Sequence, residues 1–284
     1  MSMLRALVPV GFVALTAAAA VATAAADGGG PSPGLAYGGG GIVGPGGTVR
    51  YVTLPTERGT LLEQLRVGDG NVLRWTLIPR PLAIPYVTND GATSGLSRDL
   101  RTLVLASYTN AAVNGSTRFA VVELRRFKVT QWITLRGMYA FDAIAPDAST
   151  MYLIQYTSAQ NWNRYRVRAY DLRARRLLAD PIVDKREAGE AMTGWPVTRA
   201  TGGDGRWVYT LYSRVKGSPF VHALDTRGRA AVCIDLPWHG SPNALTGIRM
   251  RLDGDRLVLT KRRAVLATVN VSTLSVASVR VPTS

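Results

Sequence analysis

Residues 145–153 read APDASTMYL: a turn that carries an aspartate, two small polar residues, and then a short apolar strand. The same order returns as SRDLRTLVL at 97–105, GDGRWVY at 203–209 and LDGDRLVL at 252–259. Successive turn aspartates are 48, 57 and 49 residues apart, at Asp99, Asp147, Asp204 and Asp253. That period is typical of a repeated four-stranded sheet. We interpret the aspartates as turn formers, because an Asp side chain can accept hydrogen bonds from its own turn.

The segments that follow each turn are also similar to one another. They read FAVVEL at 119–124, RVRAYDL at 166–172, FVHALD at 220–225 and VLATVNV at 265–271. From residue 48 onward the apolar runs are short, rich in Val, Leu, Tyr and Thr, and bounded by Gly, Asp, Pro or Asn. Such runs are typical of strands. The sequence therefore predicts an all-β chain.

These turns and strands resemble those of secreted bacterial β-propellers of the WD40-like and YVTN repeat type. In that family an S-P-D-G-x-x-L-Y-V element joins the first two strands of a blade, and V-x-V-I-D forms the third. Residues 145–153 are the best match, and the resemblance covers about 90–281, and more loosely 48–89. It implies a β-propeller of about five four-stranded blades, a fold that serves enzymes, scaffolds and receptors alike.

The repeat divides the chain into a leader, a linker and a propeller domain. We expect a signal peptide at 1–26, a Gly/Pro-rich linker at 27–47 and the propeller at 48–284. Its approximate blades are 48–89, 90–137, 138–192, 193–244 and 245–284. The inner strand of the first blade is not evident, and the segment near 35–43 is the candidate for it. A ring without that strand could be completed by a second copy of the chain.

The N-terminus has the features of an export signal. Arg5 precedes an apolar run over 6–22, and alanines at 24–26 stand where a signal peptidase cuts. Residues 27–47 contain eleven Gly and three Pro, a composition typical of a flexible linker. We therefore expect a secreted or extracytoplasmic protein without a membrane span after cleavage. An uncleaved segment that anchors the protein in the membrane is the alternative, since about 20 apolar residues can cross a bilayer.

Composition limits the chemistry that the chain can carry. There are 34 Lys and Arg against 19 Asp and Glu, a formal charge of +15, with one Cys and two His. One Cys cannot form an internal disulfide, and so few Cys and His argue against a Cys- or His-based metal site. Thirty of the 34 cationic residues are Arg. Codon bias explains this excess of Arg as well as selection for an anionic partner does. Export argues against nucleic acid, and we expect no cofactor and no metal.

Propellers usually bind ligands on the face formed by the loops that join fourth to first strands and second to third strands. Aromatic rings stack on sugars, and Arg side chains pair with carboxylates. The candidate binding residues on this face are Tyr86, Asp90, Tyr108, Trp162, Arg164, Trp195, Trp238 and His239. The alternative interpretation is that these aromatic residues fill the tops of the blades.

The sequence contains no catalytic motif, so we assign no catalytic residue. The first hypothesis is a monomeric binding or scaffold module for protein or an anionic glycan. The alternative is a propeller hydrolase, lactonase-like or glycan-acting, with its site at the channel mouth. For a metal-dependent version, Asp90, Asp142 and Asn243 are the suggestive set.

Overall fold

The computed structural model describes residues 35–36, 40–107, 115–158, 164–187, 192–214, 217–238, 242–278 and 280. The predicted signal peptide lies outside these residues. Within them, regular structure consists of strands and two short 3-10 helices, η1 (Lys185–Glu187) and η2 (Pro242–Leu245). Among the described residues, no helix has the length and apolar content that crossing a membrane requires.

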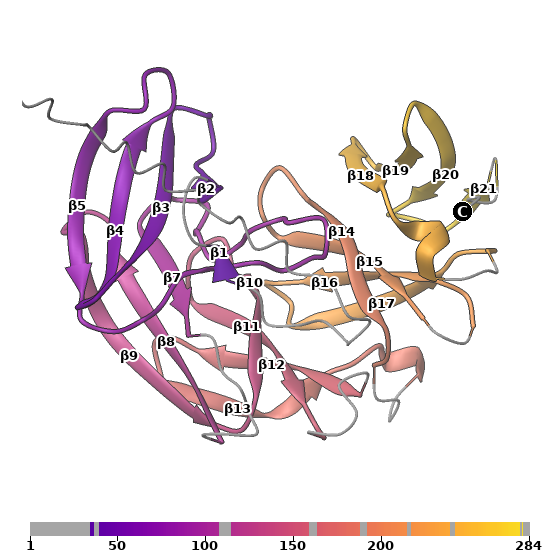
Figure 1. Cartoon of the computed structure of the whole chain (residues 1–284). Helices are drawn as coiled ribbons and strands as arrows, with labels where there is room; N and C mark the ends of the chain where they lie inside the picture. Colours follow the sequence, from indigo (N-terminus) through magenta and orange to yellow (C-terminus); the bar gives the residue numbers. More distant parts are fainter. Residues whose placement is uncertain are drawn as a thin grey trace, which may run out of the picture.

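Five antiparallel sheets follow one another along the chain, and we name them blades 1 to 5 (Figure 1). Blade 1 contains β2 (Ile42–Val43), β3 (Val49–Thr56), β4 (Gly59–Arg66) and β5 (Val72–Ile78). Blade 2 contains β7 (Thr102–Ala106), β8 (Ser116–Glu123) and β9 (Lys128–Arg136). Blade 3 contains β10 (Tyr139–Ile144), β11 (Thr150–Tyr156), β12 (Tyr165–Asp171) and β13 (Arg176–Ile182). Blade 4 contains β14 (Trp195–Thr201), β15 (Trp207–Ser213), β16 (Phe220–Asp225) and β17 (Ala230–Asp235). Blade 5 contains β18 (Ile248–Asp253), β19 (Arg256–Lys261), β20 (Ala264–Asn270) and β21 (Val276–Ser278).

Neighbouring strands within each sheet are consecutive in the chain. This arrangement is a β-propeller of five blades, as the sequence predicted. The inner strand of blade 1 is the two-residue β2, which lies inside the segment named as its candidate. The turn aspartates act as expected in three repeats, since Asp99, Asp147 and Asp204 each accept a hydrogen bond from the backbone N–H two residues later.

Blade 2 differs from the expected four-stranded form because its innermost strand is interrupted. Only isolated bridges, Ala83 with Ala106 and Leu96 with Leu103, flank β7 on its inner side. Between them residues 86–94 leave the sheet as a narrow loop closed by a bridge between Tyr86 and Thr93, which we call the central hairpin. Just before it, β6 (Ile84–Pro85) pairs with β1 (Leu35–Ala36) rather than with β7.

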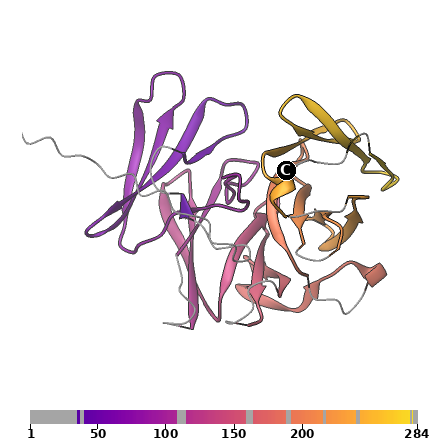
Figure 2. The same ribbon diagram turned by 45° about the vertical axis from the view of Figure 1, so that its right-hand side comes forward.

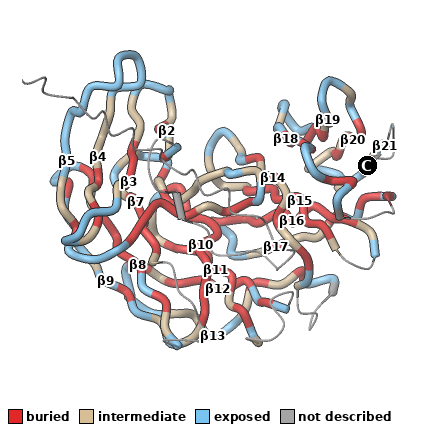
Figure 3. The backbone as a smooth tube through the Cα atoms, in the orientation of Figure 1, coloured by how far each residue is buried: buried red, intermediate tan, exposed pale blue. Residues whose placement is uncertain are grey.

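Apolar packing joins each blade to the next along the chain. Four buried clusters fill the seams between blades 1 and 2, 2 and 3, 3 and 4, and 4 and 5. No such cluster of the described residues joins blade 5 to blade 1. The two views show these blades at opposite ends of an arc (Figures 1 and 2). Buried residues are concentrated in strands such as β10, β11, β15 and β16, whereas the outer strands β5, β9 and β13 are largely exposed or half-buried (Figure 3). The described parts of blades 1 and 5 are therefore the two ends of an open arc, with no apolar seam between them.

Candidate functional site

The central hairpin crosses from blade 2 to blades 4 and 5. The backbone N–H groups of Asn89 and Asp90 donate to the carbonyl oxygens of Pro196 and Val197 on β14, at 2.9 and 3.2 Å. The Asp90 carboxylate lies 3.3 Å from the Arg249 guanidinium on β18. Two members of the candidate set, Tyr86 and Asp90, thus lie near the middle of the arc because the hairpin carries them there.

Little free space remains between the hairpin and the inner strands. The cavity at this level measures about 30 Å³ and is lined by residues that include Tyr86, Asn89, Asp142, Pro196 and Tyr212. That volume is about the share of one liquid water molecule. A sugar or peptide group does not fit there, so a ligand of that size must bind at a face of the arc.

A buried ion pair lies beside this cavity and joins blade 3 to blade 4. Arg199 and Asp142 side chains are only 8% and 4% exposed, and the Arg199 Nη2 pairs with the Asp142 carboxylate. Arg199 also donates from Nη1 to the Asp142 carbonyl oxygen at 2.5 Å and from Nε to the Thr210 hydroxyl at 2.9 Å. Two of the three side chains suggested for a metal, Asp90 and Asp142, are therefore each ion-paired with an arginine.

The two histidines have different places in the chain. His222 is buried between blades 3 and 4, and burial lowers its pKa to about 4. Its Nε2 has no hydrogen-bond partner among the described residues. His239, the histidine of the candidate set, lies outside the described residues.

The remaining candidate residues are spread over the loop face. Trp195 begins β14, next to the hairpin contact, and is half-buried, whereas Arg164 is exposed just before β12. Trp238 is 1% exposed, and its indole N–H donates to the Ser278 hydroxyl at 2.9 Å between blades 4 and 5. Its ring therefore packs in a seam, as the alternative interpretation of the aromatic residues expected. Tyr108 and Trp162 lie outside the described residues.

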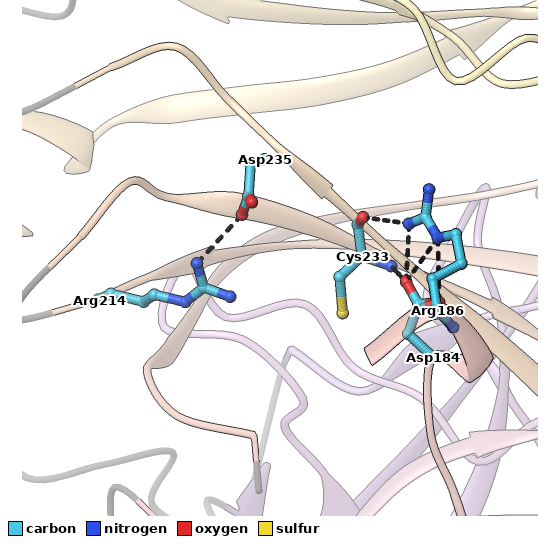
Figure 4. Close-up of polar contacts among 5 residues, drawn as sticks. All are labelled: Asp184, Arg186, Arg214, Cys233 and Asp235. Carbon is cyan, nitrogen blue, oxygen red and sulfur yellow. Dashed lines mark hydrogen bonds and ion pairs between the residues drawn. The ribbon is translucent and has the colours of Figure 1, made fainter. Parts of the chain in front are cut away.

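Two arginines outside the candidate set, Arg186 and Arg214, have local acidic partners (Figure 4). Arg186 binds the Asp184 carboxylate at 2.7 Å, and Asp184 also accepts the backbone N–H of Cys233 at 2.8 Å. Hydrogen bonds from Arg186 are the main cause that lowers the Asp184 pKa to about 2. Arg214 pairs with Asp235 at 3.0 Å. These pairs hold the loops of blades 3 and 4 against β17 and compensate part of the positive charge of this face.

The opposite face, formed by the aspartate turns, contains a larger hollow of about 370 Å³. We call it the turn-face hollow. Apolar side chains of blades 1 to 4 form one part of its wall: Ile42, Leu96, Ile144 and Val208. Polar groups form another part: Thr93, Ser94, Arg98, Arg199 and Thr201.

Three aspartate turns meet at this hollow. A methyl group added at Gly205 would lie 3.4 Å from the Pro146 Cγ and 3.6 Å from the Arg98 Cβ, so the turns of blades 2, 3 and 4 are in near contact. Gly205 has a φ of +75°, a left-handed conformation that a glycine adopts without strain. The repeat itself therefore builds the hollow, because it places equivalent turns side by side.

Arg98 is the cation of the hollow that has no ion pair among the described residues. The neighbouring carboxylate, Asp99, is turned into its own loop, where it accepts hydrogen bonds from the Ser97 hydroxyl at 2.7 Å and the Arg101 N–H at 3.0 Å. The second arginine, Arg199, is neutralised by Asp142. An anion in the hollow would thus meet an exposed guanidinium, the Ser94 and Thr201 hydroxyl groups and an apolar wall, whereas the Thr93 hydroxyl donates to the Gly41 carbonyl oxygen at 2.9 Å. The sequence reasoning missed this site because it treated the aspartate turns as structural only.

No protein-family model and no curated protein matches the sequence. Among solved structures, the chain is similar to the Cps50 (Swd1) β-propeller domain of Myceliophteria thermophila, with 12% identity, 84% of this chain and 66% of that one covered, and a TM-score of 0.47. It is also similar to the Dos1 propeller, at 12% identity, 84% and 55% coverage and a TM-score of 0.45. A third similar structure is that of Porphyromonas gingivalis dipeptidyl peptidase 4, with 11% identity, 86% of this chain and 39% of that one covered, and a TM-score of 0.48. The chain spans less than two thirds of each of these proteins, and the likeness concerns the fold alone.

Proposed function

We propose that this protein is an exported β-propeller of the WD40-like type that binds an anionic glycan in the turn-face hollow. The observation that carries the proposal is the exposed Arg98 guanidinium beside the Ser94 and Thr201 hydroxyls, over an apolar wall. A guanidinium matches a carboxylate with two parallel hydrogen bonds. Hydroxyl groups and apolar side chains suit the alternating polar and C–H surfaces of a sugar ring. The volume of about 370 Å³ lies within the usual range of ligand sites.

Export is part of the proposal, and it rests on the leader pattern of residues 1–26. Acidic polysaccharides are the anionic polymers that a protein meets outside the cell in quantity. The formal charge of +15, which falls by one when Arg5 is removed with the leader, attracts the chain to such polymers at long range, and the hollow supplies a specific contact. We do not extend the hydrolase alternative, because the Asp90 and Asp142 carboxylates considered for it are paired with Arg249 and Arg199.

The test is retention of the purified protein on an immobilised polyuronic acid, with a neutral polysaccharide of the same backbone length beside it. We expect retention on the acidic polymer only, decreasing as salt rises. Arg98→Ala should weaken it at least fivefold. Arg256→Ala is the matched control, since Arg256 is also exposed on the turn face but lies on blade 5, outside the hollow.

The loop face is tested in the same experiment, since Tyr86, Asp90, Arg164 and Trp195 remain candidate contacts there. If Arg164→Ala weakens retention and Arg98→Ala does not, the glycan binds the loop face and the turn-face hollow is not the site. Equal retention on both polymers would contradict an anion-specific function.

A further inference from the structure

The outer strand of blade 2, β9, has an unpaired edge. It is nine residues long, the longest strand among the described residues, and it lies at the outside of the arc (Figure 1). On its inner side it pairs with β8, and no strand of the described part of the chain pairs with its outer side. Blade 2 is also the blade whose sheet has three strands instead of four. An edge of this kind offers a row of backbone groups to an added strand.

The outer strands of blades 3, 4 and 5 are protected from such pairing. β13 contains Pro181, which has no N–H, and a register shift that interrupts its pairing. On β17 the Cys233 N–H and carbonyl oxygen are bound by Asp184 and Arg186, and β21 has only three residues. Of the two open outer strands, β5 and β9, β9 is the longer, and its residues 131–136 pair with β8 without interruption.

The hydrogen bonds of blade 2 show which backbone groups of β9 are free. The Arg118 carbonyl oxygen accepts the Ser107 N–H, so the even-numbered residues of β8 bond toward β7. Because bonding directions alternate along an antiparallel ladder, the odd-numbered residues of β8 bond to β9, with Ile133 among their partners. Trp132 and Thr134 therefore turn their N–H and C=O groups to the outer edge.

A groove lies beside this edge, between β9 and the outer hairpin of blade 3. It measures about 420 Å³, and its lining includes Ile133, Leu135, Tyr170 and Leu177. Gln131 on β9 donates to the Tyr170 hydroxyl at 3.3 Å and so joins the two walls. Side chains of a strand added to β9 would point into this groove at every second position, because side chains alternate between the faces of a sheet.

Cations lie on both sides of the β9 edge. Arg175 lines the groove, is exposed and has no ion pair among the described residues. On the opposite face of β9, the Arg80 guanidinium lies 4.9 Å from the centre of the Trp132 ring. The residues that line the groove include no Asp or Glu. Acidic side chains of an added strand would therefore meet a cation on either face.

We propose that β9 is a docking site for an extended acidic segment of another protein, which pairs with its outer edge and completes a fourth strand of blade 2. The backbone of that segment bonds to Trp132 and Thr134, and its acidic side chains meet Arg175 in the groove or Arg80 on the other face. In this mode of recognition the main chain supplies affinity and the alternate side chains supply specificity. The site shares no residue with the turn-face hollow and does not depend on glycan binding.

Charge and backbone chemistry separate this occupant from two others. A second β9 strand would bring like charges together, because Lys128 and Arg136 stand at its two ends and β9 contains no acid. The neighbouring acid Glu123, opposite Lys128, pairs with Arg126 at 3.5 Å. A polysaccharide lacks the regular row of N–H and C=O groups that an edge strand pairs with, so it gains nothing from that edge.

The test is fluorescence anisotropy of a labelled synthetic peptide, about eight residues long, in which Glu and Thr alternate, titrated with the full-length purified protein. Two matched peptides accompany it: one with Lys in place of Glu, and one with N-methyl groups on alternate amides, which cannot pair as a strand. We expect micromolar binding of the acidic peptide that weakens as salt rises. Both matched peptides should bind at least tenfold more weakly.

Two variants locate the site. Thr134→Pro removes an outward N–H that does not bond to β8, and Thr134→Ala, which keeps that N–H, is its control. Arg175→Glu reverses the charge in the groove, and Arg227→Glu makes the same change on the equivalent, exposed hairpin of blade 4. Thr134→Pro and Arg175→Glu should each weaken peptide binding at least fivefold, and the controls should leave it unchanged. Circular dichroism checks folding; if Thr134→Pro does not fold, Arg175→Glu and the N-methylated peptide decide.

Other outcomes would overturn the proposal. Equal binding of the acidic and N-methylated peptides would mean that charge attracts the peptide without strand pairing. No binding of the acidic peptide at millimolar protein, or binding that Arg175→Glu and Arg227→Glu weaken equally, would mean that β9 is not the site. If a polyuronic acid binds and Arg175→Glu weakens its binding while the acidic peptide does not compete, the groove takes a glycan. Self-association that Thr134→Pro abolishes would make a second copy the occupant.

Discussion

Removal of the Asp142 carboxylate tests whether the seam between blades 3 and 4 depends on a buried ion pair. In Asp142→Ala the Arg199 guanidinium remains buried and keeps only neutral acceptors, the residue 142 carbonyl oxygen and the Thr210 hydroxyl. A cation held at 8% exposure without its counter-charge is costly. Breaking one partner of such a pair destabilises proteins by about 3–5 kcal/mol. We expect a loss of about 3 kcal/mol, because the two neutral hydrogen bonds remain.

The assay is urea-induced unfolding followed by tryptophan fluorescence, on Asp142→Ala and on the double variant Asp142→Leu with Arg199→Met. The double variant removes both charges together, so its free energy of unfolding should lie only about 1 kcal/mol below that of the native chain. The remaining difference is the cost of the hydrogen-bond partner that the Thr210 hydroxyl loses with Arg199. Asp69→Ala is the control, since its pair with Arg66 is exposed to solvent and should contribute little to stability. A loss below 1 kcal/mol in Asp142→Ala, or a double variant as unstable as the single one, would refute the reasoning.

Two further expectations concern His222 and Gly205. Burial lowers the folded-state His222 pKa to about 4, so the unfolded chain binds the proton more readily, and stability should fall by up to about 3 kcal/mol between pH 6.5 and pH 4. In His222→Gln the free energy of unfolding should depend less on pH over this range than in the native chain. If the two curves coincide, His222 is not buried in solution. Gly205→Ala should cost about 1–2 kcal/mol because of its φ of +75° and should weaken glycan retention. Gly254 also has a positive φ, +61°, but open space around it, so Gly254→Ala should lower the free energy of unfolding by a similar amount in thermal melting and leave glycan retention unchanged. If both variants retain the glycan equally well, the turn-face hollow is not the binding site.

The repeat in the sequence was sufficient to predict the strands but not their exceptions. The turn aspartates and the apolar runs after them depend on local chemistry. The aspartates bond to their own turns as expected in blades 2, 3 and 4, and complete four-stranded sheets follow in blades 3, 4 and 5. Blade 2 departs from the pattern because the split of its inner strand depends on a distant contact, the hydrogen bonds of Asn89 and Asp90 to β14. No feature within residues 86–94 encodes that partner.

The candidate site was harder to predict for a similar reason. Trp238 has the same exposed-loop context in the sequence as Trp195, yet its ring is buried because blade 5 packs over it and Ser278 accepts its N–H. Arg98 was one of 30 arginines, and nothing near it in the sequence distinguishes it. It becomes distinct only because Asp99 bonds to its own turn and the turns of blades 3 and 4 lie beside it.

The positive charge can now be divided into parts with different consequences. Eleven cationic side chains form ion pairs within the described residues, and these contribute to seams and turns rather than to ligand binding. Arg98 stands apart, because its guanidinium is exposed in the turn-face hollow and has no ion pair among the described residues. Its charge is therefore the part of the cationic surface in the hollow that an anionic ligand can neutralise without first displacing a carboxylate of the protein.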